Sequence, residues 1–255
     1  MEATARFDDR VRDYLLGRPA YPAAVVEVVR RRCRVGASAR VADIGAGTGF
    51  LGGLFAAEGH EVEGVEPSEA MAEAGRRMWS EQPSASMRLG RAEATGLGDG
   101  SVDVVVVGQA FHWFDAPAVA REWARILRPG GGVALVWNRR RLSGGPFLEA
   151  YEGFLRTWGT DYDAVSESYE SAAAMGAIFD PLPEPEVLPN RQVLDHPGLV
   201  ARLRSCSYLP SRDHPRYPAM MDAIPPLFDR YAESDRVVLE YETVVFAGHS
   251  DQLEW

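Results

Sequence analysis

The sequence of 255 residues contains no lysine, so every fixed positive charge belongs to an arginine. Because this absence extends over the whole chain, it indicates a compositional bias rather than a functional feature. Acidic residues outnumber basic residues by 37 to 27, which gives a formal net charge of −10. A surface of this sign repels phosphate backbones, and we therefore expect no nucleic-acid partner.

Cysteine is scarce and long apolar runs are missing. The two cysteines, Cys33 and Cys206, are far apart, and the five histidines show no metal-ligand spacing. We therefore expect reduced structural thiols and no bound metal. No stretch approaches the roughly 20 apolar residues of a membrane span, and residues 1–12 lack the apolar segment of a secretory signal. The composition predicts a cytoplasmic protein without a membrane partner.

The first three-fifths of the chain alternate between strand and helix patterns. Residues 102–107 are almost all valine, which is typical of a parallel strand buried on both faces. Single helices between strands imply right-handed crossovers and a parallel sheet that is covered on both sides. Ser68 and Asp115 are the expected N-caps of two of these helices, the second of which should end at residues 129–132. The expected strands are 40–44, 61–66, 86–92, 102–107 and 133–137, and a further expected helix is 50–58.

After Asn138 the pattern changes. We expect helices over residues 146–178, 198–205 and 217–231, and an ordered proline-rich crossing at 181–189. Strands are expected at 191–194 and, as the antiparallel C-terminal strand, at 237–246. The fold predicted is therefore α/β: a Rossmann-like doubly wound, mostly parallel seven-stranded sheet with a helical cap.

A glycine-rich turn follows the first strand, with glycines at 45, 47 and 49. Such glycines let the backbone approach a ligand and lead into a helix N-terminus. The dinucleotide fingerprint is G-x-G-x-x-G, whereas here the spacing differs and Asp43 precedes the turn. A carboxylate at this position disfavours a pyrophosphate and suits a ligand with an ammonium group. Glu66 ends the second strand, where its carboxylate can accept hydrogen bonds from two ribose hydroxyl groups.

This pattern, D-x-G-x-G-x-G followed by an acid at the end of the second strand, resembles the class I S-adenosylmethionine (SAM)-dependent methyltransferases. Residues 91–94, with Leu97 and Asp103, are similar to the third and fourth motifs of that superfamily. Residues 127–131 resemble its turn before the fifth strand. The resemblance implies SAM as cofactor and S-adenosylhomocysteine as product.

Within the superfamily, residues 109–115 (Gln-Ala-Phe-His-Trp-Phe-Asp) resemble a signature of the trans-aconitate-methyltransferase-like branch. Tyr14, Arg18 and residues 21–22 match the N-terminal element of that branch, although Cys206 stands where arginine is common in it. These motifs lie between residues 14 and 138. The similarity of the rest of the chain is loose, so the acceptor cannot be deduced from it.

The resemblance divides a single domain of residues 1–255 into four parts. They are an N-terminal lid (1–35), a SAM-binding core (36–138), a helical cap (145–190) and a segment that completes the sheet (191–248). In such enzymes the acid equivalent to Glu93 faces the adenine amino group, and Arg18 could pair with the methionine carboxylate. The cofactor-binding residues implied in this way are Tyr14, Arg18, Asp43, Gly45, Ala46, Gly47, Glu66, Pro67, Met71, Ala92, Glu93 and Gln109.

Methyl transfer needs alignment of the acceptor with the methyl group and, for O–H or N–H acceptors, removal of a proton. His112 lies just after the fourth strand, where ligands bind in doubly wound sheets, and is the candidate general base. Alternatively, His112 and Trp113 only shape the cofactor pocket. Trp113, Tyr151 and Trp158 are candidate substrate-binding residues, with core packing as the alternative.

We expect a methyltransferase that acts on a small molecule, either a carboxylate or a natural-product scaffold. The alternative is a SAM-binding enzyme that catalyses a non-methylating reaction such as cyclisation. A nicotinamide-dependent oxidoreductase is disfavoured by Asp43 and the glycine spacing. A catalytically silent partner subunit is disfavoured because Asp43, Glu66 and Glu93 are all present. The sequence leaves O-, N- and C-methylation open, and it leaves the oligomeric state open.

Overall fold

The computed structural model describes residues 11–162 and 172–253. The chain divides into two compact units. The larger unit holds residues 21–138, 172–188 and 243–253, and the smaller unit holds residues 11–20, 139–162 and 189–242. The single domain and its four parts stay a prediction. The lid residues 1–10 and the cap residues 163–171 lie outside the described residues.

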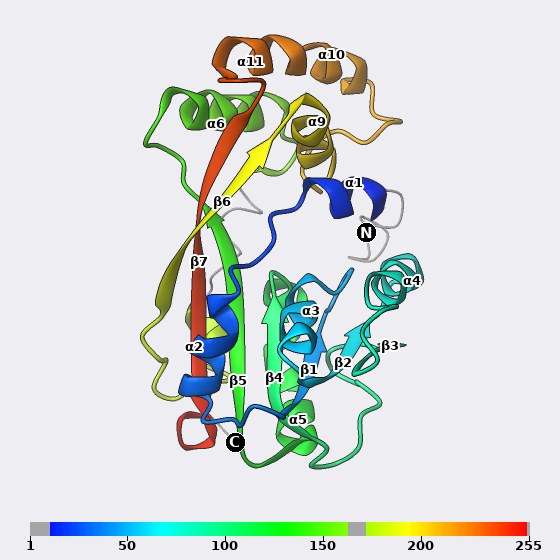
Figure 1. The fold of residues 1–255 in the computed structure, drawn as a ribbon, viewed down its shortest axis with the longest axis vertical. Coiled ribbons are helices and arrows are strands. Elements are labelled where there is room, and N and C mark those ends of the chain that lie inside the picture. Colours follow the sequence, from blue (N-terminus) through cyan, green and yellow to red (C-terminus); the bar gives the residue numbers. More distant parts are fainter. Residues whose placement is uncertain (1–10, 163–171, 254–255) are drawn as a thin grey trace. The chain divides into compact units, whose positions relative to one another are not determined.

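A seven-stranded sheet runs in the order β3-β2-β1-β4-β5-β7-β6 (Figure 1). Parallel ladders join β1 to β2 and β4, β2 to β3, and β4 to β5. The C-terminal strands are antiparallel, which confirms the predicted mixed sheet. The strands are β1 (Arg40–Ile44), β2 (Glu61–Glu66), β3 (Ala85–Leu89), β4 (Val102–Gly108), β5 (Leu127–Arg140), β6 (Glu186–Leu194) and β7 (Val237–His249).

The two faces of the sheet in the larger unit bury separate apolar clusters. Val104 and Val106 of β4 pack with α2 (Ala24–Arg32), α3 (Phe50–Ala57) and α4 (Glu69–Met78). Val105 and Val107 pack on the other face with α5 (Ala116–Ile126) and residues of and after α8 (Ala172–Met175). Successive side chains of a strand point to opposite faces. The near-continuous valine run of β4 therefore arises because helices cover both faces.

The predicted N-caps are present. The Ser68 hydroxyl accepts a hydrogen bond from the Met71 amide (3.2 Å), and the Asp115 carboxylate accepts one from the Ala118 amide (3.2 Å). The expected end of α5 at residues 129–132 is wrong, because the helix ends at Ile126 and β5 begins at Leu127. The amides of Gly100 and Ser101 bond the last two carbonyl groups of the helix (2.9 and 2.8 Å), and Leu127 pairs with Val102.

Other boundaries also differ from expectation. β3 ends at Leu89 rather than residue 92, because Arg91 and Ala94 form a local bridge instead. β6 begins at Glu186, inside the expected proline-rich crossing. The helix expected over 217–231 is two helices, α10 (Tyr217–Asp222) and α11 (Ile224–Tyr231). Residues 225 and 226 are prolines, which lack an amide hydrogen and clash with the preceding turn of a continuous helix.

The smaller unit contains α1 (Val11–Gly17), α6 (Pro146–Trp158), α9 (His196–Arg204), α10 and α11, and the last four of these helices contribute to an apolar cluster. Gly17 lets α1 approach α9 closely, since a β-carbon at this position would lie 2.4 Å from the backbone of Ala201. Within residues 11–162 and 172–253, no helix has the length and apolar character needed to cross a membrane.

Candidate cofactor-binding site

The glycine-rich turn occupies the carboxyl end of β1. Gly45, Gly47 and Gly49 have φ values of +67°, +57° and +84°, which residues with a side chain rarely adopt. The amides of Gly45 and Ala46 donate hydrogen bonds to the Val65 carbonyl group (2.8 and 3.2 Å). The turn is therefore attached to the end of β2, at the edge of the sheet where ligands bind in doubly wound folds.

Asp43 is buried at the end of β1, with 1% of its surface exposed. Its Oδ2 atom accepts a hydrogen bond from the Gly52 amide in the first turn of α3 (2.8 Å). Burial raises the pKa of the Asp43 carboxyl group to about 7; the Gly52 amide opposes this shift and the charge of Glu66 adds to it. Asp43 thus links α3 to β1 by a hydrogen bond, and its contact with the cofactor stays a prediction.

Glu66, also buried, is the second acid of the site. Its Oε2 atom accepts a hydrogen bond from the Gly47 amide (2.9 Å) and its Oε1 atom accepts one from the Ser68 amide (2.9 Å). The carboxylate is therefore oriented by both the glycine turn and the start of α4. Each carboxylate oxygen can accept more than one hydrogen bond, so ribose hydroxyl groups can still be accommodated.

The loop after β3 adds a third acid. Oε1 of Glu93 accepts a hydrogen bond from the Asp115 amide (3.2 Å), and Oε2 lies 3.6 Å from Nε of Arg91. The Gly90 amide donates to the Glu66 carbonyl group (3.2 Å), which links this loop to the end of β2. Of the other predicted cofactor residues, Ala92 and Met71 are buried and Pro67 is exposed.

The segment after β4 packs directly on the glycine turn. A β-carbon at Gly45 would lie 2.8 Å from Cβ of Ala110 and 3.0 Å from Cζ of Phe114. Gln109 adopts a φ of +58°, and its side-chain amide donates a hydrogen bond to the Asn138 carbonyl group (3.2 Å). A non-glycine residue in this conformation is strained, and such strain persists where the surroundings enforce it.

His112 and Trp113 lie on a short 3-10 helix, η3 (Phe111–Trp113), which follows the end of β4. Their ring centroids are 4.8 Å apart, and Trp113 is partly exposed. His112 therefore follows the fourth strand, as the sequence predicted. Its role as a base and the role of Trp113 toward the substrate stay predictions.

Two residues of the site had no assigned role from the sequence. The Tyr21 hydroxyl group lies against the end of β4, 2.6 Å from where a β-carbon of Gly108 would be. Trp79, at the end of α4, donates a hydrogen bond from Nε1 to the Gly49 carbonyl group (3.0 Å). Its spacing of eight residues from Met71 places both on one helix face, which is the signal that could have identified it.

The other predicted site residues belong to the smaller unit. The Arg18 guanidinium group lies 5.0 Å above the Tyr14 ring and donates to the Ser205 carbonyl group (2.7 Å). Tyr151 is fully buried on α6. Trp158 stacks with the Arg216 guanidinium group at 5.1 Å. The roles of these residues toward a cofactor or substrate stay predictions.

The smaller unit buries two guanidinium groups. Arg140 pairs with Glu152 (2.6 Å). Arg202 is only 5% exposed and donates to the Tyr241 hydroxyl group (3.1 Å) and to Sγ of Cys206 (2.9 Å). Among the described residues no carboxylate pairs with Arg202. Burial raises the pKa of the Cys206 thiol, but the charges of Arg202 and Arg18 lower it, and the net shift is downward.

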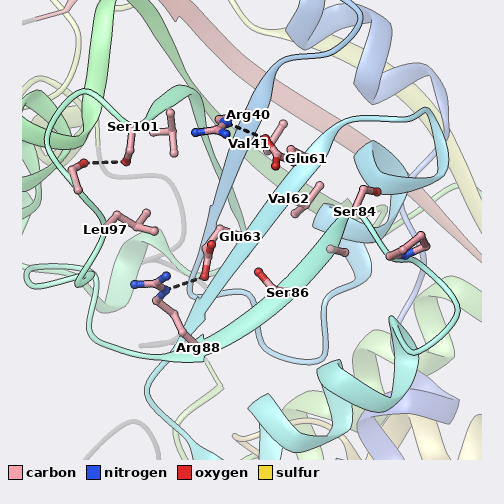
Figure 2. Close-up of a pocket in the computed structure, with 14 residues that line it drawn as sticks. Arg40, Val41, Glu61, Val62, Glu63, Ser84, Ser86, Arg88, Leu97 and Ser101 are labelled. Atoms are coloured by element: carbon pink, nitrogen blue, oxygen red, sulfur yellow. Dashed lines mark hydrogen bonds and ion pairs between the residues drawn. The ribbon is translucent and has the colours of Figure 1, made fainter.

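A polar cavity of about 360 Å³ lies at the opposite edge of the sheet, where β1, β2 and β3 begin. Figure 2 shows its charged side chains in pairs, Arg40 with Glu61 (2.6 Å) and Arg88 with Glu63 (2.7 Å). The charged side chains that line this cavity thus form ion pairs with one another. In the part of the chain that the structure describes, no group of three or more potential metal ligands could hold a metal ion.

Comparison with known proteins gives a consistent result. Residues 42–135 match the methyltransferase domain family. An uncharacterised methyltransferase of Mycobacterium tuberculosis is 40% identical over 134 residues, which cover 52% of each chain. An uncharacterised methyltransferase-like protein of Schizosaccharomyces pombe is 27% identical over 249 residues, covering 96% of this chain and 95% of that protein. The chain spans about half the length of the mycobacterial relatives it matches.

A solved structure from Anaeromyxobacter dehalogenans, provisionally assigned as a type II methyltransferase, has the same fold. It superposes with a TM-score of 0.70 at 25% identity, over 91% of this chain and 97% of that one. The matched family region includes Asp43, Glu66, Glu93 and His112, together with the whole glycine turn. Residues 42–135 of this chain are therefore similar to the methyltransferase domain family, and the cofactor that this similarity supports is S-adenosylmethionine.

Proposed function

We propose that this protein transfers a methyl group from SAM to a small-molecule acceptor. The observation that carries the proposal is the pair of buried carboxylates, Asp43 and Glu66, which backbone amides orient beside the glycine turn. Buried carboxylates attract positive charge strongly, because the surroundings have a low dielectric constant. SAM offers two positive groups, the ammonium and the sulfonium, together with the ribose hydroxyl groups, and so fits an acidic site of this kind.

The larger unit offers a group for each part of the cofactor. In the proposed arrangement Glu66 accepts hydrogen bonds from the ribose, and Glu93 faces the adenine amino group. Gly45, Ala46 and Gly47 present their backbone to the amino-acid portion, with Asp43 supplying negative charge. Pro67, Met71, Ala92 and Gln109 complete the proposed binding site, and roles for Tyr14 and Arg18 toward the cofactor stay predictions of the motif resemblance.

When bound, the cofactor supplies the activated methyl group. The chain must align the acceptor and exclude water, and alignment alone accounts for a large part of the barrier reduction in such reactions. His112 is proposed to take the proton of an O–H or N–H acceptor from its position after β4. The alternative, that His112 and Trp113 only shape the pocket, predicts no dependence of the rate on the ionisation of His112.

A carboxylate-bearing acceptor is the substrate class that we propose. The support is Arg202 of the smaller unit, a buried guanidinium group for which the described residues provide a thiol and a phenol as partners. The net charge of −10 also fits a small molecule better than a nucleic acid.

The test is calorimetric titration of the wild-type protein with SAM, S-adenosylhomocysteine and NADH, followed by Glu66→Gln. We expect both adenosyl ligands to bind and Glu66→Gln to weaken the binding by roughly tenfold or more, since hydrogen bonds to a charged group contribute about 1.5–3 kcal/mol. Glu63→Gln is the matched control, because Glu63 lies on the same strand and pairs with Arg88 instead. Binding of NADH alone would contradict the proposal. Release of S-adenosylhomocysteine in a screen of carboxylic acids would then separate methyl transfer from a non-methylating reaction.

A further inference from the structure

Trp79 lies against the glycine turn without belonging to any sequence motif of the site. It is the C-cap of α4 and is only 3% exposed. Met71, Gly75 and Trp79 are spaced by four residues and so share one face of the helix. This face meets the turn: a β-carbon at Gly47 would lie 3.5 Å from Cε of Met71, and one at Gly75 would lie 3.4 Å from the Gly47 carbonyl oxygen.

The indole ring fills space that three glycines leave open. A β-carbon would lie 2.6 Å from the ring at Gly49, 2.8 Å at Gly52 and 2.9 Å at Gly64. These glycines come from the N-cap of α3, the first turn of α3 and the middle of β2. Trp79 shares this space with Asp43, whose Oδ2 atom would lie 2.8 Å from a β-carbon at Gly52, and with Met87, whose Sδ atom would lie 2.6 Å from one at Gly64. At Gly49 the three nearest atoms all belong to the indole ring, and the residue also has a positive φ.

The indole also fixes the point at which α3 begins. The Gly49 carbonyl oxygen accepts hydrogen bonds from Nε1 of Trp79 (3.0 Å) and from the Gly53 amide (2.9 Å). Asp43, on β1, accepts a hydrogen bond from the Gly52 amide (2.8 Å). Trp79 and Asp43 thus hold the first turn of α3 from two different elements, and the amides that precede it in the glycine turn are oriented as a consequence.

We propose that Trp79 is a positioning residue for SAM binding, whose indole ring and N–H group keep the turn at residues 45–49 in its cofactor-binding conformation. This inference rests on the proposed function. Trp79 affects SAM binding through the turn and not by touching the cofactor, because its ring is buried among Gly49, Gly52 and Gly64.

The experiment compares Trp79→Phe with Trp137→Phe. Trp137 is equally buried (2% exposed) in the larger unit but packs against Phe246, with ring centroids 6.0 Å apart. Calorimetry with SAM and S-adenosylhomocysteine is done at a temperature at which thermal denaturation shows each variant to be folded. We expect Trp79→Phe to raise the Kd of both ligands by roughly five- to tenfold, as expected for one buried hydrogen bond. Trp137→Phe should leave Kd unchanged even where it lowers Tm.

A second pair of variants disturbs the ring without removing it. The new methyl group of Gly64→Ala would lie 2.6 Å from Sδ of Met87 and 2.9 Å from the indole, whereas that of Gly36→Ala would meet nothing within 4 Å. We expect Gly64→Ala to weaken SAM binding and Gly36→Ala to leave it unchanged. This pair keeps the proposal falsifiable if Trp79→Phe does not fold.

A spectroscopic readout follows the indole itself. In wild-type protein labelled with nitrogen-15, the side-chain N–H signal that disappears in Trp79→Phe should shift when S-adenosylhomocysteine is added. Unchanged Kd values in Trp79→Phe and Gly64→Ala, with normal binding by the wild type, would overturn the proposed role of Trp79 and leave the proposed function intact. A wild-type protein that binds neither adenosyl ligand would overturn the proposed function and the role of Trp79 with it.

Discussion

Replacement of Asp43 by asparagine should make the fold more stable and the protein worse at binding SAM. The Asp43 carboxylate is 1% exposed and faces the Gly52 amide and the charge of Glu66. Burial is the main reason that its pKa rises from 3.8 to about 7. Asparagine keeps the shape and can still accept the hydrogen bond from Gly52, but it cannot ionise.

The expected magnitude follows from the pKa of Asp43. The folded protein holds this proton more tightly than the unfolded chain, so the stability of the wild type falls as the pH rises from 3.8 to about 7 and is level above that. At roughly 1.4 kcal/mol for each tenfold change in proton affinity, ionised Asp43 costs the fold roughly 4 kcal/mol above pH 7. The advantage of Asp43→Asn over the wild type should therefore grow by roughly 3 kcal/mol between pH 5 and pH 8.

Urea denaturation of both proteins across this pH range measures the effect. Asp99→Asn is the control, because the Asp99 side chain is 83% exposed and its loss should change stability by less than about 0.5 kcal/mol. SAM affinity of the wild type should rise with pH through about pH 7, since a bound cation favours ionised Asp43, whereas Asp43→Asn should show no such rise. A stability difference that stays constant from pH 5 to pH 8 would show that burial does not raise the pKa of Asp43.

Three further substitutions have defined outcomes. Ser68→Ala removes the N-cap of α4 and should lower the free energy of unfolding by about 1 kcal/mol in urea denaturation, whereas Ser68→Asp should retain most of it. Gln109→Gly relieves the positive φ but removes the hydrogen bond to Asn138; we expect weaker SAM binding in calorimetry, and unchanged binding would show that the side chain is not needed. Arg202→Met should raise the pKa of the Cys206 thiol, measured by thiolate absorbance with Cys206→Ser to identify the signal, and an unchanged titration would show that the charge of Arg202 does not lower this pKa.

The order of strands and helices in the larger unit could be predicted from the sequence because its signals are local. The valine run of β4, the glycine turn after β1, and the caps Ser68 and Asp115 each depend on residues that are neighbours in the chain. The acids at the ends of β1 and β2 could be placed in the same way. A strand in a parallel sheet ends at the same edge as its neighbours, so Asp43 and Glu66 had to lie close together once both strands were assigned.

Boundaries that depend on distant partners were harder to predict. The end of α5 at Ile126 is set by amides that precede β4 in the chain, and no feature of the α5 sequence indicates it. The break between α10 and α11, in contrast, has a local cause, since the two adjacent prolines at residues 225 and 226 produce it.

The α/β class, the glycine turn and the acids around it therefore follow from local features of the sequence. How those parts are held in place depends on the tertiary structure, because each restraint joins residues far apart in the chain. Trp79 acts on Gly49 across 30 positions, and the strained backbone of Gln109 is secured by Asn138 of a neighbouring strand. The raised pKa of Asp43 is a further example: it arises from burial, which depends on the packing of the whole unit and which no local motif reveals.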